Sequence, residues 1–152
     1  MTYEELQLQY DDLFIMETDL SKINGLKGLY YDSCIAIDKN MTQSEKGCVL
    51  AEEIGHHLTS IGDILDQKIQ DNQKQEYRAR KVAYDIKIGL VGIINAFEAG
   101  CKDVYQIAEF LDVTKDFFED ALSCYKSKYG IYTKLDNYII YFYPTLNVGK
   151  IF

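Results

Sequence analysis

Residues 43–60 form a segment whose pattern strongly limits the folds open to this chain. Thr42 followed three residues later by Glu45 is typical of a capping box, which predicts a helix beginning near Gln43 and running to about Ser60. At roughly 100° per residue, four apolar side chains of this region fall within about 80° of one another and form a core-facing stripe. They are Leu50, Ile54, Leu58 and Ile61.

The opposite face of this predicted helix is polar. Glu52 and His56 lie one turn apart, within about 40° of each other around the helix axis. Side chains at positions i and i+4 lie one above the other and can hold one ion. Cys48 and Gly55 border the pair, and a residue as small as Gly55 lets another backbone or a substrate approach closely. The pattern predicts the floor of a cleft.

The stretch Glu52-Glu53-Ile-Gly-His56 differs at its first position from the His-Glu-x-x-His motif of zinc hydrolases. In the corresponding register Glu52 and His56 are metal ligands. Glu53 points about 100° away around the helix and is the base that takes a proton from water. With glutamate at the first position, we expect weaker binding of Zn²⁺ and better tolerance of Mn²⁺ or Fe²⁺.

A third ligand is expected from a second long helix, predicted over residues 73–97. Glu76 lies on the same stripe as Ala79 and Ala83, so its carboxylate faces inward and needs a partner. A metal shared with His56 would supply that partner. A salt bridge to a lysine or arginine would do so equally well, and the pattern does not separate the two.

A second register is open for the motif. It pairs Glu53 with His57 and leaves Glu52 outside, but then no adjacent carboxylate follows the first ligand. The other roles open to His57 are to orient substrate, to stabilise the developing oxyanion, or to cap the helix end at the surface.

The rest of the chain predicts an α+β fold, mainly helical, around one ordinary core, as its 152 residues allow. Apolar spacing, glycines and turn residues define the remaining elements. They are a helix over 4–20, a hairpin of 29–31 and 34–37, a loop over 62–72, two short helices over 103–111 and 114–128, and a hairpin of 131–133 and 138–143.

Charge and apolar content argue against some classes of function. The net charge of −8 argues against nucleic-acid binding, and acidic residues make 103–128 a structural helical pair rather than a DNA-reading one. No apolar run reaches the length of a membrane span, and the N-terminus has no export signal. We expect a cytoplasmic protein whose four cysteines are reduced and buried. The oligomeric state is open.

Three linked segments, at 48–60, 62–66 and 74–84, together resemble the ImmA/IrrE family of metallo-endopeptidases. The similarity is to the phage and mobile-element branch of Gram-positive bacteria. Residues 28–31 before the motif helix and 107–113 after it also resemble that branch. The resemblance therefore extends over most of the chain.

The resemblance implies a single zincin-like domain over residues 1–152. In that fold a small sheet lies beside the active-site helix, and the helical pair 103–128 and the hairpin 131–143 pack on the domain. It also implies cleavage, or metal-dependent antagonism, of a helix-turn-helix repressor that keeps a phage or integrative element silent.

On this reading Glu52, His56 and Glu76 bind Zn²⁺ and Glu53 activates water. The alternative is a catalytically silent module that sequesters or recruits the repressor through the same cleft.

Overall fold

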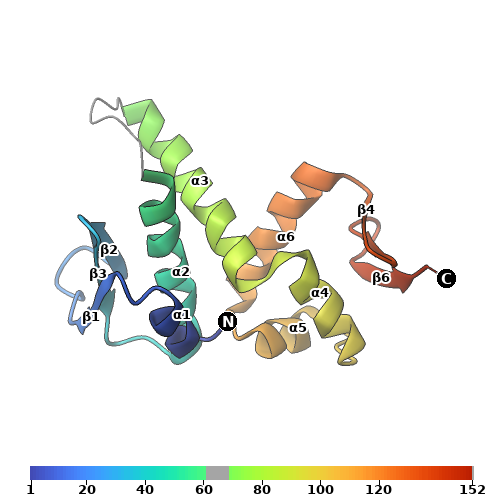
Figure 1. Cartoon of the computed structure of the whole chain (residues 1–152), viewed down its shortest axis with the longest axis horizontal. Coiled ribbons are helices and arrows are strands. Elements are labelled where there is room, and N and C mark those ends of the chain that lie inside the picture. Colours follow the sequence, from blue (N-terminus) through green and yellow to red (C-terminus); the bar gives the residue numbers. More distant parts are fainter. Residues whose placement is uncertain (61–68, 152) are drawn as a thin grey trace. The chain divides into compact units, whose positions relative to one another are not determined.

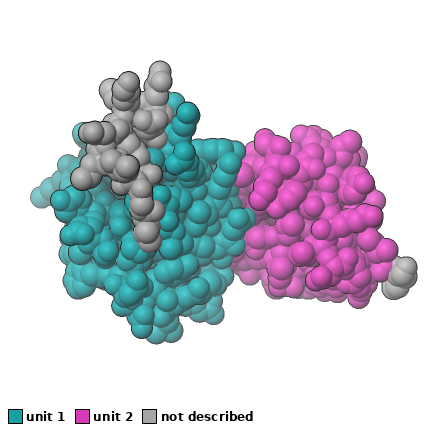
Figure 2. All heavy atoms as spheres, turned by 45° about the horizontal axis from the view of Figure 1, so that its top comes forward, with its two compact units in different colours: residues 1–86 teal, residues 87–152 magenta. Residues whose placement is uncertain are grey.

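A computed structural model describes residues 1–60 and 69–151. The fold is α+β and mainly helical, as predicted. The chain divides into two compact units, unit 1 over Met1–Ile86 and unit 2 over Lys87–Phe152 (Figure 2). The expectation of one domain over 1–152 stays a prediction. In the part of the chain that the structure describes, no helix has the length and apolar character needed to cross a membrane.

Unit 1 contains a three-stranded sheet in the order β1-β3-β2. β1 (Phe14–Thr18) runs parallel to β3 (Cys34–Asp38), and β2 (Gly28–Tyr31) runs antiparallel to β3. The turn between β2 and β3 is made by Asp32 and Ser33, both with positive φ, as tight hairpins require. The hairpin predicted over 29–37 is therefore confirmed.

The predicted helix over residues 4–20 is wrong in its second half. α1 (Tyr3–Gln9) is held at its start by Thr2, whose hydroxyl accepts from the Glu5 amide in a capping box. The chain then turns and continues as β1. Pairing with β3, a contact about twenty residues away along the chain, overrides the helical spacing of the apolar residues.

α2 (Gln43–Ser60) packs against β2, β3 and α1 (Figure 1). Its predicted start is confirmed, because the Thr42 hydroxyl accepts from the Glu45 amide at 3.2 Å. Leu50 and Ile54 are fully buried. Leu58 was also expected in the core but is 40% exposed in the last turns of the helix, and Ile61 lies outside the described residues.

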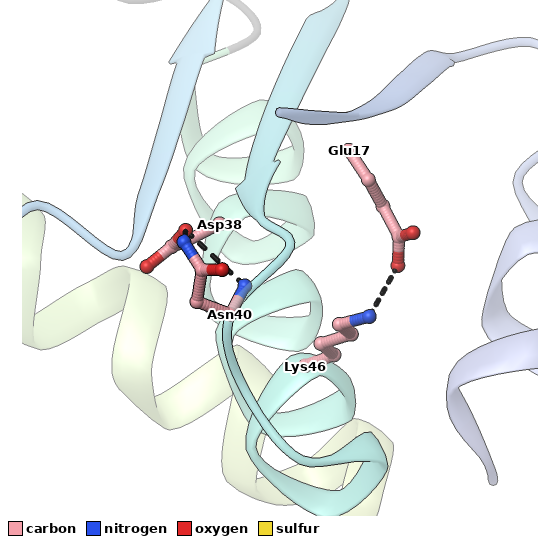
Figure 3. A network of polar contacts seen from close by, with 4 residues as sticks. All are labelled: Glu17, Asp38, Asn40 and Lys46. Carbon is pink, nitrogen blue, oxygen red and sulfur yellow. Dashed lines mark hydrogen bonds and ion pairs between the residues drawn. The ribbon is translucent and has the colours of Figure 1, made fainter. Parts of the chain in front are cut away.

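Polar contacts attach the sheet to the start of α2 (Figure 3). The Lys46 ammonium, although buried, contacts the Glu17 carboxylate at 2.8 Å, and this bond lowers the pKa of Glu17. Asp38, at the end of β3, accepts from the side-chain amide of Asn40 at 3.0 Å. The segment leading into α2 is thereby held against the sheet that carries β2.

The second long helix is two helices rather than one. α3 (Ile69–Lys87) begins before the predicted residue 73, within the expected loop of 62–72, of which 62–68 lie outside the described residues. α4 (Gly89–Glu98) follows after a break at Ile88. Gly89 adopts φ +64°, a conformation open to glycine that ends the helix within an otherwise apolar run.

Unit 2 confirms most of its predicted elements. Asp103 and Thr114 cap the two short helices, and Asp136 with positive φ turns the C-terminal hairpin. A third strand was not predicted, and the sheet has the order β4-β5-β6. The elements are α5 (Val104–Leu111), α6 (Lys115–Tyr129), β4 (Tyr132–Leu135), β5 (Tyr138–Tyr141) and β6 (Asn147–Lys150).

Candidate metal and catalytic site

A cavity of about 470 Å³ lies in unit 1 where the polar face of α2 meets α3 and strand β2. α2 and α3 run side by side, with the sheet on the other side of α2 (Figure 1). The described residues that line the cavity come from these three elements and from the chain just before β2. They are Leu26, Gly28, Leu29, Tyr30, Glu53, His56, Thr59, Ser60, Gln75 and Glu76.

His56 and Glu76 meet in this cavity. The imidazole Nε2 lies 3.3 Å from Oε1 of Glu76, although the two residues are twenty positions apart on different helices. The partner that the structure gives Glu76 is the imidazole of His56 itself, which differs from both partners considered from the sequence, a shared metal and a lysine or arginine. The Glu76 side chain is 56% exposed, so it lies at the mouth of the cavity. The inward-facing position predicted from its stripe is therefore wrong.

The close approach of the two helices depends on Gly55. A Cβ at this position would lie 2.2 Å from the carbonyl oxygen of Ala79, well inside contact distance. The small residue beside the Glu52–His56 pair thus admits the backbone of α3, one of the two approaches that the sequence left open. It brings Glu76, one turn before Ala79, up to His56.

Glu53 has the most perturbed acidity in the cavity. Burial raises the pKa of its carboxyl to about 7, and the charges of Glu52 and then Glu76 add to the shift. A carboxyl group with this pKa gains and loses a proton near neutral pH, as a general base must. Gly28 makes room for it, because a Cβ there would lie 2.9 Å from Oε1 of Glu53.

Glu52 as a third metal ligand stays a prediction. Within the ranges 1–60 and 69–151, no group of three or more histidine, cysteine, aspartate or glutamate side chains is arranged to hold a metal ion. The structure therefore joins two of the three predicted ligands, His56 and Glu76. The carboxylate of Glu52 lies close enough to Glu53 to act on its pKa.

The chemistry of the site nevertheless fits a divalent cation. Carboxylate and imidazole groups suit Zn²⁺, Mn²⁺ and Fe²⁺. The described residues that line the cavity include Glu53 and Glu76 and no lysine or arginine. A cation would offset this negative charge, which adds to the effect of burial in raising the pKa of Glu53.

His57 points away from His56 and towards the sheet. Its Nδ1 lies 2.9 Å from the hydroxyl of Tyr30, and the two rings meet edge to face with centroids 5.5 Å apart. The imidazole is half-buried, which differs from a surface helix cap. Because His56, and not His57, lines the cavity and meets Glu76, the arrangement favours the register of Glu52 and His56 over that of Glu53 and His57.

Sequence reasoning did not identify four polar residues of the cavity wall, Tyr30, Thr59, Ser60 and Gln75. Thr59 and Ser60 turn their hydroxyls back onto helix carbonyls, at 2.8 Å from Gly55 and 3.1 Å from His57. Tyr30 contacts the side chain of a predicted site residue, His57. The alternation of β2 gives a signal for it, since Tyr30 faces α2 while its neighbours face away.

A helix that presents a carboxylate and an imidazole to a cavity beside an edge strand is compatible with a metallopeptidase-type α+β domain. A family model makes the assignment specific: Peptidase_M78, described as the IrrE N-terminal-like domain, matches residues 8–123. The match covers most of the chain and extends into both units, so the chain belongs to this family, whose members are generally metal-dependent. No curated protein and no solved structure matches it.

Proposed function

We propose that this protein is a metal-dependent endopeptidase that cleaves or inactivates a helix-turn-helix repressor of a phage or mobile element in the cytoplasm. The observation that carries the proposal is the contact between His56 and Glu76 at 3.3 Å, in a cavity that also holds Glu53. The substrate class comes from the resemblance of the chain to the ImmA/IrrE family. We expect no direct contact with nucleic acid or membrane.

Glu52, His56 and Glu76 would hold the metal, Zn²⁺ or else Mn²⁺ or Fe²⁺. When bound, such a cation polarises a peptide carbonyl and lowers the pKa of water. Glu53 then accepts the proton of that water and passes it to the leaving amine. The raised pKa of Glu53 supports this role, since a base that titrates near neutral pH can both take up and release the proton.

The walls of the cavity would position the substrate. β2 is the edge strand of its sheet, so one side of its backbone is open to pair with an extended peptide. Tyr30, fixed by its contact with His57, offers a hydroxyl on the cavity wall. His57 would therefore act on substrate through Tyr30.

Metal content is the first test. Native protein should bind about one equivalent of Zn²⁺ or Mn²⁺. His56→Ala and Glu76→Ala should lose most of it, because each removes a ligand. His57→Gln is the matched control, since it replaces the neighbouring imidazole and should keep the metal. Equal metal content in all four proteins would contradict the assigned ligands.

Cleavage is the second test. Glu53→Gln should keep the metal and lose cleavage of a co-expressed helix-turn-helix repressor by about 10²-fold or more, measured by mass spectrometry of the products. Cleavage by the Gln variant at the native rate would show that the base is another group.

A second candidate function has one observation in its favour. Because no group of three or more histidine, cysteine, aspartate or glutamate side chains in the described ranges is arranged to hold a metal ion, the cavity would serve as a silent module that binds the repressor without cutting it. Release of the repressor that is unaffected by a chelator, from protein that contains no metal, would favour this module over the peptidase.

A further inference from the structure

The sheet of unit 1 carries apolar side chains on both faces, beside Glu17 at an inner position and the pair Thr18–Asp38 at the end of the outer face. Ile35 and Ile37 of β3 are fully buried on the inner face. Residues directly opposite one another share a face, so the strand register also defines the outer face. It carries two cross-strand rows, here called the outer apolar face. They are Phe14–Cys34–Tyr31 and Met16–Ala36–Leu29.

A sheet with one face in water normally alternates apolar inward and polar outward positions. None of the six outward residues in these two rows is charged, in a chain whose residues are 26% charged. Four of them are large and exposed: Phe14 by 63%, Met16 by 44%, Leu29 by 49% and Tyr31 by 78%. Together they present roughly 500 Å², near the upper end for the largest apolar patch of a monomer. This face has the composition of a buried surface.

The shape of the outer apolar face suits a second copy of itself. In each row the central strand carries a small side chain, Cys34 or Ala36, and the flanking strands carry large ones. Two such sheets stacked about 10 Å apart can place the large side chains of one over the small centre of the other. A two-fold axis allows both copies to do this at once.

We propose that the outer apolar face is the interface of a weak homodimer, with two copies of this chain packed sheet to sheet. Two copies that each carry a net charge of −8 repel one another, so they must meet where the surface lacks charge, as these rows do. The two patches would bury about 1,000 Å², the lower limit for a specific interface, so the dimer should depend on concentration.

The dimer has a consequence for the cavity. Leu29 belongs to the outer apolar face and also to the cavity lining. The second copy would therefore lie at the rim of the cavity, along the edge strand β2. This inference does not depend on peptidase activity, because it rests on the sheet alone.

Sedimentation equilibrium from micromolar to near-millimolar concentration tests the proposal. Wild-type protein should shift from monomer to dimer across this range. Phe14→Thr with Tyr31→Thr should raise the dissociation constant by about tenfold or more, while threonine preserves strand preference. Tyr132→Thr is the matched control, because it replaces an exposed tyrosine on β4 of unit 2 and should dimerise as the wild type does.

Crosslinking provides a second measurement in a chain with an unaltered patch. Cys34 is exposed near the middle of the outer apolar face, whereas Cys48 and Cys124 are buried. A bis-maleimide with an arm of about 10 Å should link two copies through Cys34. The product should persist in Cys101→Ser and disappear in Cys34→Ser. A wild type that stays monomeric at every concentration would overturn the proposal. A dimer whose dissociation constant is unchanged by Phe14→Thr with Tyr31→Thr would overturn it too.

Discussion

The two units of the chain follow different rules. In unit 2 the two short helices begin at side chains that accept a backbone amide, Asp103 at 2.8 Å and Thr114 at 3.1 Å. Phe118 and Phe142 are fully buried, and Phe142 stacks on Tyr129. Helix caps and closely packed aromatic side chains of this kind stabilise a fold.

Unit 1 instead gathers groups that oppose its stability. Burial and neighbouring carboxylates raise the pKa of Glu53 to about 7, and the cavity beside it leaves the facing side chains incompletely packed. Departures of this kind concentrate at functional sites. These two features make unit 1 the part of the chain where we expect the functional site.

The largest expected effect concerns the pH dependence of stability in metal-free protein. The folded-state pKa of Glu53, about 7, lies above its ordinary value of 4.5. The folded protein therefore keeps a proton that the unfolded chain has already released. Stability should fall as pH rises from about 4.5 to about 7, by up to about 3 kcal/mol. Urea denaturation in EDTA across this range measures the slope.

Glu53→Gln has no proton to exchange and should remove this decline, leaving the variant more stable than wild type at pH 8. Glu109→Gln, at an exposed position of α5 in unit 2, is the comparison. If both variants kept the wild-type dependence of stability on pH, Glu53 would not be the group whose protonation causes it. The contrast between the two units would then weaken.

Glycine-to-alanine substitutions in one helix of each unit come next. Gly55→Ala places a methyl group 2.2 Å from a backbone carbonyl of α3, so α2 and α3 must separate, at a cost of about 2 kcal/mol. Gly92→Ala in α4 meets only the movable end of Leu111 at 3.3 Å. It should be neutral or stabilising by up to about 1 kcal/mol.

Thermal denaturation measures both glycine variants. Metal binding should be lost along with stability in Gly55→Ala, because separation of the helices moves Glu76 away from His56. A Gly55→Ala protein with native stability and metal content would show that the close backbone contact is unnecessary.

The smallest effect concerns the wall of the cavity. Tyr30→Phe removes the hydroxyl that contacts His57 and should cost about 1 kcal/mol of stability. It should also weaken binding of a repressor-derived peptide. Tyr31→Phe is the control on the next residue, whose side chain is 78% exposed. Denaturation and peptide titration of the two variants compare the hydroxyl of Tyr30 with the exposed hydroxyl of Tyr31. Equal stability and equal peptide affinity in both variants would show that Tyr30 is not part of the site.

Local signals were sufficient to predict much of the fold. The cap at Thr42, the turn at Asp32 and Ser33 and the caps of α5 and α6 act within a few residues, so the sequence displays them directly. β1 was missed because its pairing with β3 is long-range. The break at Gly89 was missed because apolar residues continue on both sides of it.

The same distinction between local signals and long-range contacts applies to the candidate site. Glu52, Glu53 and His56 share one helix, and its periodicity predicted Glu52 and His56 on the polar face and Glu53 about 100° away before any coordinates. The hydrogen bond between Tyr30 and His57 joins a strand to a helix, and no spacing rule relates the two residues. The pKa of Glu53 depends on burial, which appears only when β2 lies against α2.

The missing side chain at Gly55 has a consequence for engineering. Because the spacing between the helices is determined there by backbone atoms, a change of donor at position 52 need not alter it. If Glu52 is a metal ligand as proposed, histidine grafted at that position would exchange a hard oxygen donor for a nitrogen donor on an unchanged frame. On the proposed function, metal preference would then be adjustable independently of the architecture.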